Sequence, residues 1–136
     1  MIKSFKDLDV YNNSYKACIL VMKEIIPRLP VSERFDLKDQ LSRSCKAIPR
    51  LIAEGYAKKH QKAGFQKYLD DAMAECNETL VGLEQCKDIY NINTDLSQEL
   101  INLYDKTARQ IFNLALAWDN FKLRSRRTTT LNDTGS

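Results

Sequence analysis

Histidine, cysteine and carboxylate side chains are the groups in this sequence that could catalyse a reaction or hold a metal ion. Among 136 residues there is one histidine, His60. A di-metal site in a helical bundle needs a Glu-x-x-His motif on each of two helices, and a serine or cysteine nucleophile needs a histidine beside it as a base. One histidine, expected in an exposed helix connection, meets neither need. We therefore expect no enzyme, with no catalytic, metal-binding or cofactor-binding residue.

The four cysteines form no C-x-x-C pair, and hydrophobic periodicity assigns each of them to the core face of a helix. They are Cys18, Cys45, Cys76 and Cys86. A structural zinc site would need more ligands at short spacing, so we expect reduced, buried thiols of the kind found in cytoplasmic proteins. The chain shows neither a signal-peptide core nor an uncharged apolar run of about 18 residues, so neither export nor membrane insertion is expected.

Charge is distributed unevenly along the chain, although its net value is only +3. Residues 38–67 carry eight lysines and arginines against two acids, a net charge of +6, whereas residues 70–119 carry ten acids against three basic residues, a net charge of −7. Asp70, Asp71, Glu75 and Glu78 follow one another at helical spacing, and we expect them to form a solvated or intersubunit acidic surface. The basic segment predicts an anionic partner.

The basic side chains best placed for such a partner lie on one helix face and on the turn that follows it. Spacings of three and four residues make the first three project from one side of a helix, and the next three extend the patch around the turn. Arginines near the C-terminus add further positive charge. The candidate nucleic-acid-binding residues are Arg43, Lys46, Arg50, Lys58, Lys59, Lys62, Arg124, Arg126 and Arg127.

Three interpretations of this charge pattern stay open. The charges are solvated and recognise nothing, the basic and acidic surfaces attract one another between subunits, or the basic surface binds RNA phosphates with a steep salt dependence. Tyr56, Phe65 and Tyr68 lie among the lysines. Such aromatic residues either stack on bases or, as we favour here, pack against a neighbouring subunit.

The elements that position these residues are predicted to be helices. Four glycines and three prolines are too few for the many turns of a β-sandwich or barrel. Apolar residues recur at three- and four-residue spacing in four segments with short connections, which predicts an all-α, antiparallel, up-down-up-down four-helix bundle. The predicted core stripes begin Leu8, Tyr11, Tyr15, Cys18, Met22; Leu37, Leu41, Cys45, Ile48; Phe65, Leu69, Ala72, Cys76; and Leu96, Leu100, Leu103, Thr107.

Pro49 and Gly55, in the second of these four segments, are residue types that are unfavourable inside a regular helix. Pro49 removes a backbone donor, but the apolar stripe keeps its register through it, so we expect a kink near Pro49 and no break. Gly55 stands where the stripe ends and can adopt the left-handed conformation that closes a helix. A chain of this length is expected to form one domain, with residues 1–123 as the bundle and residues 124–136 as a flexible basic and polar tail.

Several short motifs resemble those of the 23S rRNA intervening sequence proteins, also called the S23 ribosomal protein family. Phe5–Val10 is similar to the family's F-K-D-L-x-V start, although Tyr11 stands where tryptophan is usual. The most specific element is Ile52-Ala53-Glu54-Gly55 following Ile48-Pro49. Leu51 replaces an asparagine, and Ala57-Lys58 replaces a Gly-Arg pair. The resemblance covers roughly residues 5–121.

The resemblance implies a bacterial, cytoplasmic four-helix bundle that assembles as a homopentamer without enzymatic activity, with RNA as a partner. A related branch contains the accessory proteins of diversity-generating retroelements, which bind a reverse transcriptase and its RNA. A role as such an accessory subunit is the alternative function. No membrane partner is expected.

Overall fold

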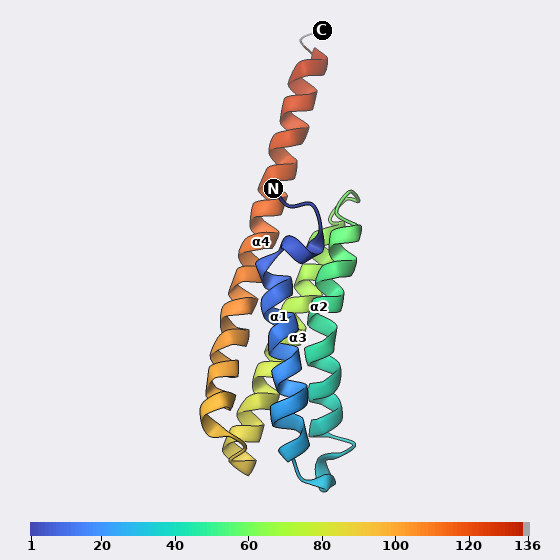
Figure 1. Ribbon diagram of the computed structural model, residues 1–136. Helices are drawn as coiled ribbons and strands as arrows, with labels where there is room; N and C mark the ends of the chain where they lie inside the picture. Colours follow the sequence, from blue (N-terminus) through green and yellow to red (C-terminus); the bar gives the residue numbers. More distant parts are fainter. Residues whose placement is uncertain (135–136) are drawn as a thin grey trace.

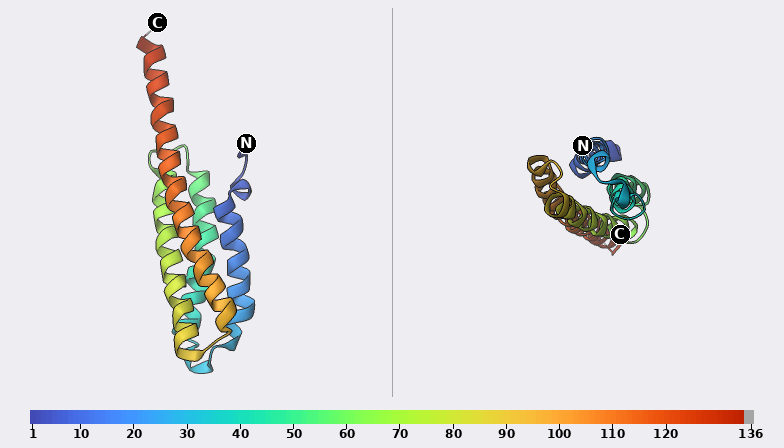
Figure 2. Two further views of the ribbon diagram at one scale, coloured as in Figure 1. Left: turned by 90° about the vertical axis from the view of Figure 1, so that its left-hand side faces the viewer. Right: turned by 90° about the horizontal axis from the view of Figure 1, so that it is seen from below.

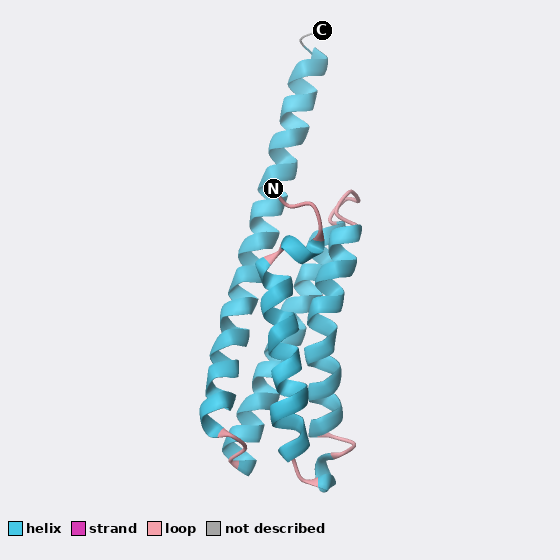
Figure 3. Ribbon diagram, in the orientation of Figure 1, coloured by secondary structure: helices cyan, strands magenta, loops and turns pink. Residues whose placement is uncertain are grey.

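Helices make up almost all of the protein. The computed structural model describes the backbone of residues 1–134 and the side chains of residues 1–119. It contains α1 (Asp9–Leu20), α2 (Leu37–Ala57), α3 (Gly64–Tyr90) and α4 (Thr94–Thr134), together with the short helical turns η1 (Phe5–Asp7), η2 (Val21–Ile25), η3 (Ile26–Arg28) and η4 (Val31–Glu33). Residues 1–134 contain no strand (Figure 3), which confirms the predicted all-α class.

The four long helices run alternately down and up in one bundle (Figure 1). α1 packs against α2 and α4, and α3 packs against the same two helices on the other side, as the view along the axis in Figure 2 shows. This is the predicted antiparallel up-down-up-down topology. α4 is the longest helix and projects beyond the ends of the other three.

The α4 backbone continues to Thr134, through most of the segment predicted to be a tail. The side chains of residues 120–136, and so those of Arg124, Arg126 and Arg127, lie outside the described residues. The domain boundary at residue 123 and the flexibility of the segment after it stay predictions.

The buried face of α1 differs from the predicted stripe. Ser14 and Ala17 are buried, as are Val10 and Val21, whereas Tyr15 is 51% exposed. The centre of the buried face thus carries small side chains, and the larger ring of Tyr15 lies at the surface. The helix is therefore rotated so that the predicted stripe lies at its edge, where Tyr11, Cys18 and Met22 are partly buried.

After α1 the helix first widens, then tightens, and then ends. The backbone forms a single π-type segment, η2, and then η3, where Pro27 lies in the first turn. Leu29 and Pro30 adopt extended conformations that end the helical run. Proline ends the helical run here because it lacks a backbone N–H and disfavours a helical conformation of the residue before it.

α2 continues through Pro49 as predicted, because the residues around the proline are buried. Ile48 and Ile52 are fully inaccessible to solvent, and Pro49 is buried too. Their burial offsets the hydrogen bond that proline cannot donate. The bend that we expect at this proline stays a prediction.

Gly55 does not close α2 in a left-handed conformation, and that prediction is wrong. No glycine of the described chain has a positive φ, and α2 continues to Ala57. Gly55 is instead a contact point, because a Cβ added there would lie 2.6 Å from the Cβ of Tyr68 on α3. The left-handed conformations belong to Ala63, before α3, and to Asn91 and Asn93, in the turn before α4.

Candidate nucleic-acid interface

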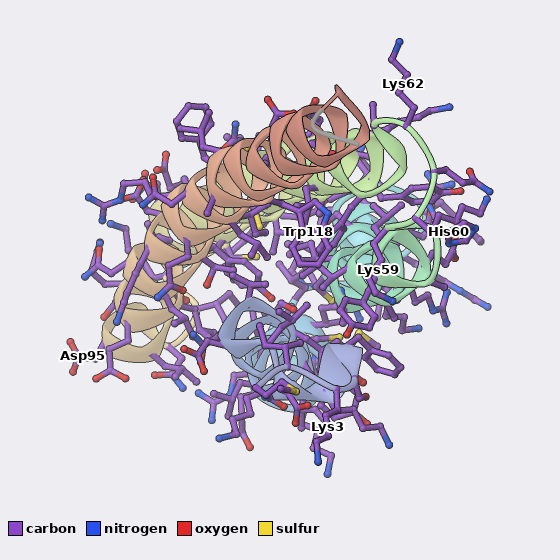
Figure 4. All side chains as sticks on the ribbon, turned by 90° about the horizontal axis from the view of Figure 1, so that it is seen from above. Lys3, Lys59, His60, Lys62, Asp95 and Trp118 are labelled. Carbon is purple, nitrogen blue, oxygen red and sulfur yellow. The ribbon has the colours of Figure 1, made fainter. Side chains whose placement is uncertain are left out.

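The predicted basic residues with described side chains lie on one edge of the bundle. Three lie on α2, and three lie in the connection from α2 to α3 at the end of the bundle seen in Figure 4. Arg43 and Arg50 are exposed, and Lys46 between them is partly buried. At 1.5 Å per residue, Arg43 and Lys58 are separated by about 22 Å along the helix axis, so the patch is elongated.

Three of these six cations already have a partner within the protein. Arg43 forms an ion pair with Asp39 one turn earlier, with Nε to Oδ2 at 3.3 Å. Lys58 donates a hydrogen bond of 2.7 Å to the hydroxyl of Tyr68, and this bond together with the charge of Glu54 raises the pKa of Lys58. Lys59 lies over the ring of Tyr56, 4.1 Å from its centroid. These contacts partly neutralise the three positive charges, so these side chains would contribute less to the binding of an anionic partner.

The other three cations have no ion pair within the described side chains of residues 1–119. They are Lys46, Arg50 and Lys62. The side chain of Lys62 points away from the bundle at the end of the α2–α3 connection (Figure 4). Lys46 and Arg50 instead border a pocket between α1 and α2. These three are the strongest candidates for contacts with phosphate groups.

That pocket is the feature of the site that sequence reasoning missed. It has a volume of about 270 Å³ and is lined by Phe5, Tyr11, Tyr15, Cys18, Lys46, Pro49, Arg50 and Ala53. We call these residues the aromatic–basic pocket. Tyr11 and Tyr15 were expected in the core, because their spacing fits a helical stripe. An equally regular stripe from Val10 through Ser14 and Ala17 was the signal that could have placed them outside.

The aromatic rings of the pocket are held against one another. Phe5 and Tyr11 meet edge to face with centroids 4.8 Å apart, and Tyr11 and Tyr15 are stacked at 5.9 Å with an interplanar angle of 29°. Exposed tyrosine faces beside cationic side chains can stack on bases while the cations contact phosphates. The aromatic–basic pocket therefore has the groups needed to bind a single-stranded nucleic acid.

The aromatic residues predicted beside the lysines have a structural role instead. Phe65 is fully buried and meets Tyr56 and Trp118 edge to face, with centroids 6.0 and 5.2 Å away. Tyr56 is 9% exposed. Packing was the favoured alternative for these rings, but the partner is the protein's own core. Neither Tyr56 nor Phe65 can stack on a base.

The acidic residues are spread over the surface of α3. Asp70, Asp71 and Glu78 are exposed, and Glu75 is partly buried. Burial and the neighbouring carboxylate of Glu78 raise the pKa of Glu75. Within the described residues, no group of three or more His, Cys, Asp or Glu side chains is placed to hold a metal ion.

The cysteines are free thiols with unequal exposure. Cys45, Cys76 and Cys86 are buried as predicted, but Cys18 is only partly buried and borders the aromatic–basic pocket. His60 is exposed in the α2–α3 connection, where the sequence places it. None of the described helices is both long and apolar enough to cross a membrane.

Comparison with known proteins identifies one family. The sequence model described as 23S rRNA-intervening sequence protein matches residues 6–113, which include α1, α2, α3, the N-terminal part of α4 and the aromatic–basic pocket except Phe5. No curated protein matches the chain. The matched range ends before the C-terminal part of α4.

Proposed function

This chain belongs to the 23S rRNA-intervening sequence protein family, and from that premise we propose that it is a non-enzymatic, self-associating helical bundle that binds RNA. The observation that carries the proposal is the aromatic–basic pocket, where Lys46 and Arg50 lie beside the exposed ring of Tyr15 and the partly buried ring of Tyr11. The description of the family names a ribosomal RNA. Four free cysteines favour a cytoplasmic location for this activity.

Geometry favours single-stranded over double-stranded RNA as the ligand. Tyr15 is 51% exposed, so its outer surface is available to one unstacked base. In a duplex the bases are stacked on one another and unavailable, whereas loops and bulges present them to aromatic side chains. Lys46 and Arg50 then lie one helical turn apart beside that base, close enough to contact consecutive phosphates.

A titration of single-stranded RNA at several salt concentrations tests the RNA part of the proposal. If three cations contact phosphates, the logarithm of the association constant falls against the logarithm of salt with a slope of about −2. Replacing Lys46 and Arg50 by glutamine reduces that slope and weakens binding at least tenfold at low salt. Tyr15→Ala weakens binding through lost stacking, by about 1–3 kcal/mol, without changing the slope.

The matched control removes the same charge elsewhere. Lys106→Gln with Arg109→Gln deletes two cations from the exposed side of α4, where Arg109 pairs with Asp105 at 3.1 Å. This variant retains the affinity of the unaltered protein if the aromatic–basic pocket is the site. Equal weakening by both double variants would show that only net charge attracts the RNA. No binding at low salt would overturn the RNA proposal.

Self-association is supported by apolar side chains on the outer surface of the bundle. Phe112 and Leu116 on α4 are 52% and 51% exposed and lie one helical turn apart, and Val81 on α3 is 50% exposed. Exposed apolar groups beside acidic residues would be covered when a basic face of another copy docks there. We propose a homo-oligomer, with five subunits as the number that the family resemblance implies.

Light scattering of the purified protein tests the assembly. The proposed mass is five times that of one chain, and Phe112→Ser with Leu116→Ser lowers it towards the mass of a single chain. Phe35→Ser is the control, because it changes an aromatic residue that is 86% exposed in the connection before α2, outside the apolar surface of α3 and α4. A single-chain mass at micromolar concentration would show that the assembly proposal is wrong.

A further inference from the structure

Two cysteines from different helices lie against one another behind the aromatic–basic pocket. The Sγ atoms of Cys18 on α1 and Cys45 on α2 are 3.6 Å apart, although 27 positions separate the residues in the sequence. This is a contact distance between two unbonded sulfur atoms. A disulfide requires a length of about 2.05 Å, so the two sulfur atoms have to move closer by rotation of their side chains before they can bond.

The two thiols differ in solvent access. Cys18 is partly exposed and lines the aromatic–basic pocket, whose volume of about 270 Å³ exceeds that of a small oxidant. Cys45 is completely buried, and its Sγ also lies 3.6 Å from the carbonyl oxygen of Ser42. One sulfur can therefore meet a reagent from solvent, while the other can be reached only through the first.

The surroundings also favour different protonation states. The hydrogen bond between the two thiols, followed by the charges of Lys46 and Arg50, lowers the pKa of Cys18 to about 7. The same bond and burial raise the pKa of Cys45. The buried hydroxyl of Tyr104 on α4 faces the same two thiols. Burial, followed by the charges of these thiols, raises the pKa of Tyr104, so its hydroxyl stays protonated. Cys18 thus supplies the thiolate, which is the nucleophilic form of cysteine.

We propose that Cys18 and Cys45 form a peroxide-sensitive thiol pair that closes into a disulfide joining α1 to α2. In the first step the Cys18 thiolate attacks one oxygen of hydrogen peroxide. The O–O bond breaks, and Cys18 becomes a sulfenic acid while hydroxide leaves and takes up a proton as water. This inference does not depend on RNA binding.

The second step forms the disulfide. The sulfur of Cys45 attacks the sulfur of Cys18, the S–O bond breaks, and the departing hydroxide takes the Cys45 proton to form a second water. In total, two thiols lose two electrons to one peroxide, which becomes two water molecules. A thiol reductant reverses the change by exchange at Cys18, the more accessible sulfur.

The remaining cysteines provide internal controls. Cys76 and Cys86 are buried, and burial raises their pKa to about 12 and about 11. Neither has another sulfur within hydrogen-bonding distance among the described side chains of residues 1–119. They should therefore react slowly with peroxide and form no disulfide within the folded chain.

Peptide mapping of the oxidised protein tests the proposal directly. Trypsin places Cys18 in residues 17–23, Cys45 in residues 44–46, and both other cysteines in residues 68–87. One equivalent of peroxide should lower the intact mass by two hydrogen atoms and link peptides 17–23 and 44–46, and a thiol reductant should restore both. Four thiols left reduced, or a link to peptide 68–87 or between chains, would overturn the proposal.

Two variants separate the roles of the sulfur atoms. Cys45→Ser should leave Cys18 as a sulfenic acid that a dimedone probe labels, whereas Cys18→Ser should abolish both labelling and the link. Cys86→Ser is the matched control and should form the link as the unaltered protein does. Alkylation of the native protein should modify Cys18 at least tenfold faster than Cys76, and equal rates would contradict the assigned roles even if a variant fails to fold.

Discussion

α2 meets α3 and α1 in two different ways. Along the contact between α2 and α3, which we call the α2–α3 seam, Gly55 approaches Tyr68 and Gly82 approaches Leu41 so closely that an added Cβ would lie 2.6 or 2.7 Å from the facing atom. Along the contact between α1 and α2, the α1–α2 seam, large side chains leave a pocket of about 270 Å³. A surface pocket of about 350 Å³ also borders the α2–α3 seam beside Leu41 and Gly82. We therefore call the α2–α3 side tightly packed only for its glycine contacts, and the α1–α2 side open for the partly exposed thiol and tyrosine that line its pocket.

The two seams differ in what their residues do: those of the α2–α3 seam stabilise the fold, and those of the α1–α2 seam are available for binding and reaction. Glycine and small polar residues bring the backbones of α2 and α3 together, and the hydroxyl of Thr79 donates a buried hydrogen bond of 2.8 Å to Ser44. The open α1–α2 seam has the partly exposed thiol, the unpaired cations and the exposed tyrosine. Changes in the α2–α3 seam should therefore alter folding, whereas changes in the α1–α2 seam should alter binding and reactivity.

The largest expected effect is the loss of a ring from the tightly packed side. Phe65 is fully buried and contacts both Tyr56 and Trp118. Phe65→Ala should lower the free energy of unfolding by about 3–5 kcal/mol, because it removes buried apolar surface and leaves a cavity. Urea unfolding followed by circular dichroism measures the change.

Tyr15→Ala is the comparison from the open side. It also removes an aromatic ring from a helix, but this ring is 51% exposed. Its loss should cost less than about 1 kcal/mol, since little of its surface is removed from water on folding. Equal destabilisation by the two alanine variants would contradict the distinction between the two seams.

Adding one methyl group at the closest helix contact should have the next largest effect. Gly55→Ala places a Cβ 2.6 Å from the Cβ of Tyr68 and 3.1 Å from Cδ1 of Phe65. The first of these atoms is attached directly to the α3 backbone, so the helices must separate, and we expect a loss of about 1–3 kcal/mol. The urea midpoint measures it.

Gly82→Ala provides the matched comparison within the same seam. Its added Cβ would lie 2.7 Å from Cδ2 of Leu41, the end of a flexible side chain. Cγ of Leu41 would lie 2.9 Å away, and both atoms move when the side chain rotates about χ1, whereas the Cβ of Tyr68 cannot move without its backbone. The loss should therefore be smaller than that of Gly55→Ala. The reverse order would mean that the backbones of α2 and α3 can separate near Gly55 at little cost.

A smaller effect is expected from the buried hydroxyl pair. Thr79→Val keeps the shape of the side chain but removes the bonds to Ser44 and to the carbonyl of Glu75, at 2.8 and 2.9 Å. The loss should be about 1 kcal/mol, because the Ser44 hydroxyl keeps only a weak bond of 3.4 Å to the Leu41 carbonyl. Thr107→Val, which removes one bond of 2.8 Å to the Leu103 carbonyl, is the control and should cost less.

The tightly packed side of α2 was largely predictable from the sequence. Leu37, Leu41, Cys45, Ile48 and Ile52 are the predicted core stripe, and each is 5% exposed or less. One apolar stripe on an otherwise polar helix leaves a single way to face the core. The prediction for Gly55 failed because glycine is used both at helix ends and at close contacts, and only the position of Tyr68 on α3 decides between them.

The open side of α2 was not predictable in the same way. α1 carries two stripes at helical spacing, and the one with the larger rings was expected inside. The structure instead buries the stripe with Ser14 and Ala17 and leaves the ring of Tyr15 51% exposed. The aromatic–basic pocket exists only once α1 is placed beside Lys46 and Arg50, so no single segment of the sequence contains it.

The smallest effect concerns a polar contact at the end of the α2–α3 seam. Glu33 accepts a hydrogen bond of 2.6 Å from the hydroxyl of Tyr90 at the end of α3 and one of 3.1 Å from the backbone N–H of Leu37 at the start of α2. These bonds lower the pKa of Glu33. Because the folded-state pKa lies below the unfolded one, the stabilisation is complete above the unfolded value of about 4.3 and is lost as the pH falls through the folded value.

Glu33→Gln should therefore reduce the loss of stability that the protein shows between pH 7 and pH 3, measured as the shift of the urea midpoint. The expected change is small, since the contact is near the surface and water competes for it. Glu24→Gln is the control, because Glu24 is exposed and has no hydrogen bond or ion pair within the described side chains. An identical pH dependence in the Glu33→Gln variant and the unaltered protein would show that the end of the α2–α3 seam is held by apolar packing alone.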